Sequence, residues 1–150
     1  MIRVFIGSHK RFARCEPVIK HSILKHASEP VEINFLRPDD CGCEDSGCTG
    51  FSKMRWEVPR ICNYIGHAIY LDVDMILMED IAGLFYPYAD KDNHCLYDGS
   101  TEVMVMSCEN NRSPVPDIGL RWNSEDYSAT PESISFASLI HFTDLKNQPW

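Results

Sequence analysis

The chain has 150 residues, of which 44% are hydrophobic, and a formal net charge of −8. This length suits one hydrophobic core and predicts a single domain over residues 1–150. The acidic balance argues against a nucleic-acid surface, which needs clustered Lys and Arg to neutralise phosphates. Every apolar run is shorter than the roughly 20 residues that span a bilayer, and residues 1–7 are too short for a signal-peptide core. We therefore expect a cytoplasmic protein without a membrane span.

The first third of the chain predicts a β-α-β unit. Residues 2–6 are rich in β-formers and end at a Gly-Ser pair, as a strand followed by a loop does. Residues 12–26 carry apolar side chains near helical spacing, with Pro17 tolerable only near the helix start. Residues 31–36 alternate apolar and polar side chains. Such a unit is right-handed and parallel, so we expect an α/β fold: a mostly parallel, Rossmann-like sheet flanked by helices.

A polar stretch with Cys41, Cys43 and Cys48 follows and predicts a long loop. The chain has seven cysteines, an odd number, and no secretory signal, so most are expected to be reduced thiols. The spacing of the three loop cysteines matches none of the strong zinc patterns. A structural zinc site completed by another residue stays open as the alternative.

Residues 51–65 predict a helix that Pro59 kinks or divides. The apolar run of residues 68–77 then predicts a buried strand, interrupted by Asp72 and Asp74. A carboxylate in an apolar interior needs a cation nearby, or its pKa shifts until it is neutral. If Asp72 lies in the strand and Asp74 just beyond it, both converge at the carboxyl end, where open α/β sheets bind ligands. The alternative is that both cap turns or pair with lysines.

The remaining elements are shorter. Residues 79–85 predict a helix with acidic residues at its start, and residues 94–97 and 102–108 predict two strands, the second strongly buried. Residues 110–131 read as a loop with one short helix, and "LRWN" is its only dense feature. A final apolar segment at residues 135–142 ends near His141.

The segment from Gly66 to Phe85, "GHAIYLDVDMILMEDIAGLF", resembles the DxD strand of glycosyltransferases with the GT-A fold, in particular the glycogenin- and galactosyltransferase-like families. In those families the aspartates hold a divalent metal against the diphosphate of a nucleotide sugar. The ending "HFTDLKNQPW" resembles the family's C-terminal motif, although Asp144 and Gln148 replace its usual glycine and lysine. The resemblance implies a third metal ligand in the tail and a lysine beside the diphosphate.

The resemblance implies a set of site residues. Mn²⁺, with Mg²⁺ as second choice, suits two carboxylates and an imidazole. Asp98 and Glu102 flank a turn on the side of the transferred sugar and are the candidate catalytic residues, with turn roles equally open. The implied metal ligands are Asp72, Asp74 and His141, and the implied donor-binding residues are Ile6, Gly7, Ser8, His9, Arg55, Asp72, Val73 and Lys146.

The implied activity is transfer of a hexose from a UDP-sugar, with retention favoured and inversion left open. The acceptor is a saccharide, lipid or protein, and whether the chain forms a homodimer is open. Relatives are typically longer, and comparably short forms occur in phages and viruses. The alternatives are a nucleotidyltransferase-like enzyme, for which "FIGSHKRF" lacks a glycine-rich phosphate loop, and a non-catalytic module that binds a nucleotide sugar or metal.

Overall fold

The computed structural model describes most of the chain. The described residues are 1–38, 53–89, 95–97, 100–110, 115–116, 118–125, 131–144 and 148–150. The cysteine-rich loop of residues 41–48, Asp98 and Lys146 lie outside these ranges, so the predictions made for them stay predictions. Within the described ranges, no helix is long and apolar enough to cross a membrane.

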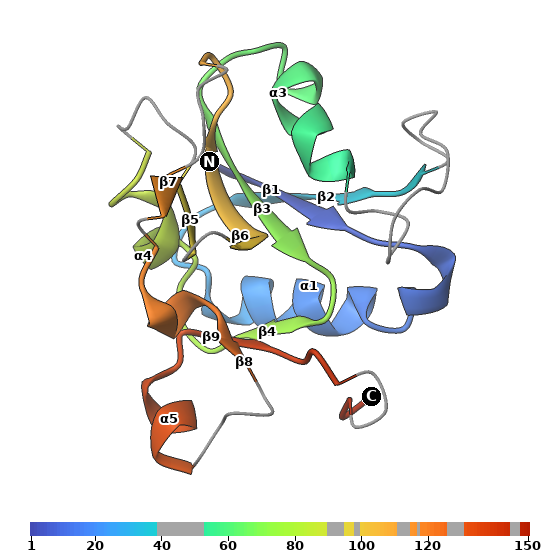
Figure 1. Cartoon of the computed structure of the whole chain (residues 1–150), viewed down its shortest axis with the longest axis vertical. Helices are drawn as coiled ribbons and strands as arrows, with labels where there is room; N and C mark the ends of the chain where they lie inside the picture. The colour runs from blue at the N-terminus through green and yellow to red at the C-terminus, as the bar shows by residue number, and fades with distance from the viewer. Residues whose placement is uncertain are drawn as a thin grey trace.

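The central sheet is mixed, and its parallel part is the predicted β-α-β unit (Figure 1). Parallel ladders join β1 to β2 and to β3, whereas β6 runs antiparallel to β3 and to β5, and the short β7 runs parallel to β5. The α/β fold class is thereby confirmed. In spatial order the strands are β2 (Val31–Leu36), β1 (Ile2–Gly7), β3 (His67–Asp72), β6 (Ser100–Ser107), β5 (Cys95–Tyr97) and β7 (Val115–Pro116).

A second, three-stranded sheet contains β4 (Met75–Leu77), β9 (Leu139–His141) and β8 (Ser124–Glu125), with β9 in the middle. The strand expected over residues 68–77 is therefore two strands. The chain turns after β3 because residues 75–77 pair with β9, antiparallel, rather than continuing in the central sheet. β7 and β8 lie in the segment that the sequence predicted as loop. This turn is what carries Asp74 out of the central sheet.

The helices follow the predicted order with shifted bounds. The first begins at Glu16 rather than residue 12, because Pro17 fits the first helical turn, and a 3-10 turn precedes it. The segment of residues 53–61 is divided as expected, with Pro59 in the first turn of its α-helical part. The helical elements are η1 (Lys10–Phe12), α1 (Glu16–His26), η2 (Met54–Glu57), α3 (Val58–Ile61), α4 (Ala82–Phe85), η3 (Leu120–Trp122) and α5 (Pro131–Phe136).

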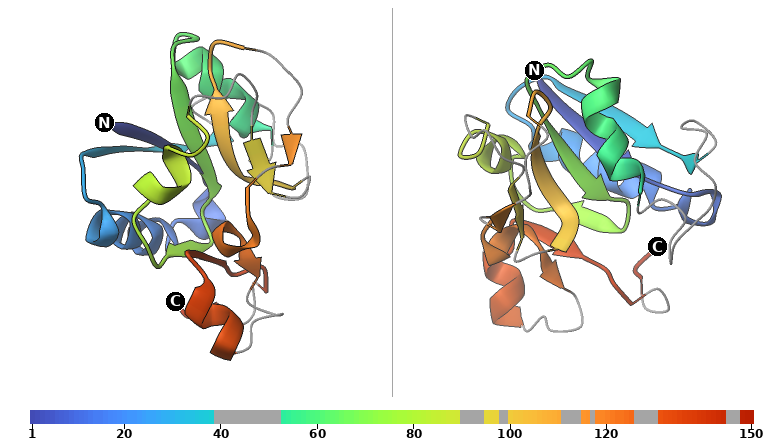
Figure 2. Two further views of the ribbon diagram at one scale, coloured as in Figure 1. Left: turned by 90° about the vertical axis from the view of Figure 1, so that its left-hand side faces the viewer. Right: turned by 45° about the horizontal axis from the view of Figure 1, so that its top comes forward.

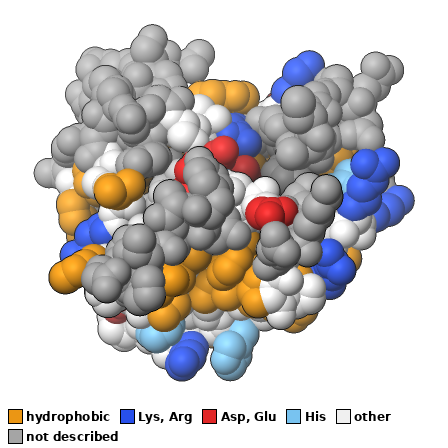
Figure 3. Space-filling view, turned by 60° about the horizontal axis from the view of Figure 1, so that its bottom comes forward, with side chains coloured by type: hydrophobic (Ala, Val, Ile, Leu, Met, Phe, Trp, Pro, Cys, Tyr) orange, Lys and Arg blue, Asp and Glu red, His pale blue; other side chains and the backbone are white. Residues whose placement is uncertain are grey.

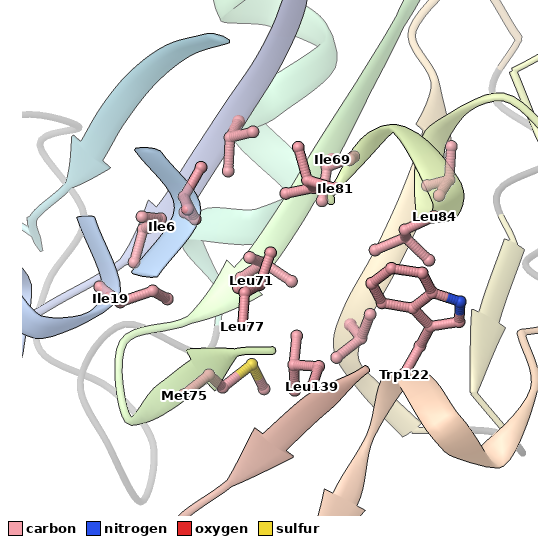
Figure 4. Packing of buried hydrophobic residues seen from close by; sticks show 14 of the residues in the cluster. Ile6, Ile19, Ile69, Leu71, Met75, Leu77, Ile81, Leu84, Trp122 and Leu139 are labelled. Carbon is pink, nitrogen blue, oxygen red and sulfur yellow. The ribbon is translucent and has the colours of Figure 1, made fainter. Parts of the chain in front are cut away.

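The central sheet is covered on both faces, and the period-two pattern of its strands decides which side chains face which layer. On one face, Ile69 and Leu71 of β3 pack with Ile19 and Ile23 of α1 (Figure 4). On the other face, Tyr70 packs with side chains of η2 and α3. Figure 2 (left) shows α1 and α3 on opposite sides of the sheet. Because both faces are buried at β3, this strand is apolar from Ala68 to Leu71.

Candidate functional site

The candidate site lies where β1 and β3 end. These strands are parallel, and Gly7 at the end of β1 pairs in register with Asp72 at the end of β3. Asp72 is 8% exposed, and Asp74 follows in the turn that leads to β4. Asp72 thus lies in the strand and Asp74 just beyond it, as the sequence predicted, at the carboxyl edge where α/β sheets bind ligands.

Asp72 meets its cation inside the protein. Its Oδ1 accepts from Arg55 Nη2 at 3.3 Å and from the Tyr70 hydroxyl at 2.9 Å. Burial raises the pKa of Asp72 to about 7, although Arg55 and the Tyr70 hydroxyl act in the opposite direction. The carboxyl group therefore sits at the balance between its charged and neutral forms near neutral pH.

Arg55 is itself buried, with 5% of its surface exposed. Its guanidinium lies 4.9 Å from the centre of the Tyr70 ring, and Nη1 also donates to the Thr101 hydroxyl. Among the described residues, its Nε has no hydrogen-bond partner, which is unusual for a buried polar atom. By contrast, Arg60 is exposed and pairs with Glu57.

The C-terminal segment brings His141 to Asp74. β9 pairs with β4, and the backbone N–H of Phe142 donates to the Asp74 carbonyl at 2.9 Å. His141 is buried, and its Nε2 lies 3.3 Å from Asp74 Oδ1. Two residues 67 positions apart in sequence therefore meet side chain to side chain. The resemblance to the transferase motif implied that these residues lie close together, but no local sequence pattern predicts it.

The other ring nitrogen of His141 faces two oxygens. Nδ1 lies 3.1 Å from Asn123 Oδ1 and 3.4 Å from Glu102 Oε2. Both neighbours accept hydrogen bonds, so Nδ1 carries a proton and Nε2 is the atom directed at Asp74. Burial disfavours the imidazolium, but the hydrogen bonds to Asp74 and Glu102 outweigh it and raise the pKa of His141 to about 10.

Glu102 contacts His141, and the catalytic role predicted for it stays a prediction. The hydrogen bond to His141 lowers the pKa of Glu102 to about 2, and Asn123 Nδ2 also donates to its carboxylate at 3.4 Å. A carboxylate with so low a pKa is a weak general base at neutral pH. The structure therefore places Glu102 as a partner of His141.

The sequence did not identify Asn123. It is 1% exposed and follows η3, at the end of the "LRWN" feature. Its amide contacts both His141 and Glu102, so it connects the two side chains. Only the density of bulky residues just before it, in a segment otherwise read as loop, could have drawn attention to this position.

The residues predicted to seat the nucleotide lie beside Asp72 but differ in exposure. Ile6 and Ser8 have no exposed surface, and the Ser8 hydroxyl donates to Glu16 at 2.7 Å. His9 is partly exposed and caps η1 by accepting from the Arg11 N–H. Val73 is 1% exposed. Of these residues, His9 is the one with a partly exposed side chain, and the nucleotide-binding role predicted for the set stays a prediction.

The donor types at this site suit a divalent cation, since two carboxylates and one imidazole are ligands that Mn²⁺ accepts. As they lie here, however, Asp72 faces Arg55 while Asp74 faces His141. In the part of the chain that the structure describes, no group of three or more His, Cys, Asp or Glu side chains is arranged to hold a metal ion. The side-chain types of Asp72, Asp74 and His141 fit a divalent metal. In this structure, however, the two carboxylates belong to two neighbouring ion pairs.

The end of the chain packs near this site. Trp150 Nε1 donates to Cys15 Sγ at 2.8 Å, and its ring meets Phe142 edge to face at a centroid distance of 5.1 Å. Cys15 is a buried free thiol, as are Cys62 and Cys108, in agreement with the reduced state expected for the core cysteines. Burial raises the pKa of Cys15. The Trp150 ring thus covers an otherwise unreactive thiol at the start of α1.

We expect Trp150→Ala to uncover Cys15, because the indole is the group that contacts its sulfur. Cys15 should then react faster with iodoacetamide, as followed by peptide mass spectrometry at pH 8. Cys62, which packs in the hydrophobic cluster on the other face of the sheet, is the internal control and should keep its rate. An unchanged rate at Cys15 would show that the tail does not shield it.

With this geometry in place, comparison with known proteins identifies the fold. No protein-family model matches the sequence. Protein CDI of Arabidopsis thaliana is 33% identical over 90 residues, which cover 55% of this chain and 35% of that protein. The chain therefore spans about a third of the length of this relative.

Solved structures match over nearly the whole chain. The bifunctional glycosyltransferase WbbM in its apo form matches with a TM-score of 0.71 at 10% identity, covering 95% of this chain and 45% of WbbM. The galactosyltransferase LgtC, in complex with donor and acceptor sugar analogs, matches with a TM-score of 0.68 at 10% identity, covering 95% and 87%. Mouse xyloside xylosyltransferase 1 matches with a TM-score of 0.63 at 9% identity, covering 99% of each chain.

The chain has the fold of these glycosyltransferases. The GT-A-like fold that the sequence resemblance implied is thereby confirmed. Identities of about 10% carry the fold alone, so the roles of Asp72, Asp74 and His141 rest on this chain's own geometry.

Proposed function

We propose that this protein is a metal-dependent glycosyltransferase that moves a hexose from a UDP-sugar to an acceptor. The observation that carries the proposal is the meeting of Asp74 and His141, next to Asp72, at the carboxyl edge of β1 and β3. Titratable groups with perturbed pKa values gather at functional sites, and Asp72 and His141 are two such groups. The fold shared with glycosyltransferases makes glycosyl transfer the reaction that suits this edge.

Asp72, Asp74 and His141 would hold the metal, with Mn²⁺ preferred to Mg²⁺ because of the imidazole. A bound metal would supply Lewis-acid stabilisation of the charge that develops on the departing diphosphate. The side chains around these ligands have separate tasks. Glu102 and Asn123 fix the His141 ring by accepting at Nδ1 and leave Nε2 for the metal.

Arg55 is proposed to bind the donor. Its Nε is the buried side-chain atom without a partner in the described part of the chain, and an oxygen of the donor would satisfy it. The same guanidinium holds Asp72 in place through Nη2. Arg55 would therefore couple donor binding to the position of one metal ligand.

The deciding experiment is a donor screen in the presence of Mn²⁺. Release of nucleoside diphosphate should be fastest with a UDP-hexose and should be lost in EDTA. Release of pyrophosphate from a nucleoside triphosphate and a sugar phosphate would instead support a nucleotidyltransferase. Failure to bind or cleave any nucleotide sugar would reject the proposal. With an active donor, NMR of the product's anomeric proton separates retention, which we propose, from inversion.

Asn123→Ala should weaken Mn²⁺ binding by about 10- to 100-fold, the usual cost of removing a group that orients a metal-binding histidine. The free metal can be followed by electron paramagnetic resonance without any substrate. Asn34→Ala is the matched control, because this amide contacts only the exposed Glu32 in the described hydrogen bonds. Equal Mn²⁺ affinity in the two variants would remove Asn123 from the site.

A further inference from the structure

An apolar groove of about 470 Å³ lies between α1 and β4, and the proposed site uses none of its lining side chains. The α1 residues that line the groove recur at intervals of three and four positions, so they lie on one face of the helix. Its walls include Pro17, Val18, His21 and Lys25 of α1, and Ile76 and Met78 from β4 and the residue after it. We call the exposed side of α1, which also carries Lys20 and Leu24, together with the groove the α1–β4 face.

The groove floor has its polar groups already paired. The Ser22 hydroxyl accepts from the Leu77 N–H at 3.1 Å and donates to the Ile19 carbonyl at 2.9 Å. The backbone N–H of Leu77 in β4 is thus already hydrogen-bonded to α1. A peptide strand would find no free N–H at Leu77 to pair with, whereas an apolar chain needs none.

The exposed side of α1 carries positive charges, although the whole chain carries −8. Lys20, His21 and Lys25 are exposed on this helix, and its one acidic residue, Glu16, is paired with Arg37 at 2.6 Å. Glu79 and Asp80 follow Met78 in the sequence. Glu79 pairs with Arg121, and Asp80 accepts from the backbone N–H groups of Ser28 and Ala82. A negatively charged surface that approaches α1 would therefore meet Lys20 and Lys25.

Exposed apolar side chains accompany these cations. Leu24 of α1 is 51% exposed, and Met78 after β4 is 43% exposed. Figure 3 shows one face with hydrophobic side chains across its middle, Asp and Glu side chains above them, and Lys, Arg and His side chains along the margin. Apolar groups bordered by cations suit a ligand that has both an apolar chain and an anionic head.

We propose that the α1–β4 face docks on the surface of a bilayer that contains anionic phospholipids. Lys20 and Lys25 would lie at the phosphate level, while Leu24, Met78 and the groove would take up apolar surface from the acyl region. An acidic protein partner would pair with Lys20 and Lys25, but its charged side chains would not fill the apolar groove. The proposal is independent of the proposed catalytic function, because it involves none of the site residues.

The test is co-sedimentation of the whole chain with vesicles at low ionic strength. Vesicles with equal parts of phosphatidylcholine and phosphatidylglycerol should bind the protein, and vesicles of phosphatidylcholine alone should not. Lys20→Gln/Lys25→Gln should weaken binding about thirty-fold, because each Lys near an anionic surface contributes about 1 kcal/mol. Met78→Gln should also weaken binding, and circular dichroism should show that each variant is folded.

The matched control is Lys53→Gln/Arg60→Gln, which removes the same charge from exposed residues at the α3 layer, on the other side of the sheet (Figure 1). It should bind the anionic vesicles like the original protein. An equal loss in both double variants would mean that net charge alone drives binding and would overturn the proposal. Binding to neutral vesicles, no binding to anionic ones, or displacement from vesicles by soluble polyglutamate would overturn it too; the last would favour an acidic protein partner.

Discussion

Asp74→Asn should weaken Mn²⁺ binding at least about 100-fold and remove Mn²⁺-dependent donor turnover. Groups that only orient a ligand cost 10- to 100-fold when removed, and a direct ligand should cost no less. The fold should survive, because the exchange keeps the Asp74 backbone carbonyl that accepts from the Phe142 N–H. Calorimetry with Mn²⁺ alone and with Mn²⁺ plus UDP measures the two effects separately. Glu32→Gln, which removes an exposed carboxylate on β2, is the control and should leave both unchanged.

A second consequence of Asp74→Asn can be measured without metal. Asp74 is one of the two carboxylates that hold the pKa of His141 at about 10 against the effect of burial. The variant should therefore lower that pKa, as followed by the ring proton shifts of His141 in an NMR titration. Unchanged titration together with unchanged Mn²⁺ affinity would show that Asp74 and His141 do not form one site.

The parts of the site that the sequence predicted are those carried by local pattern. The apolar run of residues 68–71 predicts the strand, and the energetic cost of a buried carboxylate marks Asp72 as a site residue. Both features can be recognised in the local sequence. The divided helix before it follows similarly from Pro59. The C-terminal His141 was identified by resemblance to a motif, since no local pattern links it to a residue 67 positions away.

The parts that the sequence missed depend on pairing between distant short segments. β8 contains two residues and is a strand only because it pairs with β9. Two residues are too few to show the alternation of apolar and polar side chains that predicts a strand. The Asn123 amide lies at this junction, where η3 ends and β8 begins. The contact of Glu102 with His141 was not predicted either, since it depends on where the antiparallel pairing of β3 and β6 places this side chain. Such contacts follow from topology and cannot be read from spacing.

Arg55→Met should destabilise the protein by about 3–5 kcal/mol at pH 8, the usual cost of leaving one member of a buried ion pair without its partner. Methionine fills much of the same volume, so the loss reports the charge of Asp72 rather than a cavity. Urea unfolding followed by circular dichroism measures it. Arg60→Met, in an exposed pair with Glu57, is the control and should change stability by less than about 1 kcal/mol.

The pH dependence of the Arg55→Met effect identifies its cause. A carboxyl group with a higher pKa in the folded protein takes up a proton on folding, so its contribution to stability falls as pH rises between the two values. For Asp72 these are the ordinary 3.8 and about 7. Without Arg55 the folded value rises further, and the loss continues above pH 7. The variant should therefore lie closer to the original protein at pH 5 than at pH 8. Arg55→Met/Asp72→Asn has no carboxyl group at position 72, so its stability should fall less between pH 5 and pH 8 than that of Arg55→Met. If the single variant instead showed equal losses at both pH values, Asp72 would not be the group that Arg55 stabilises.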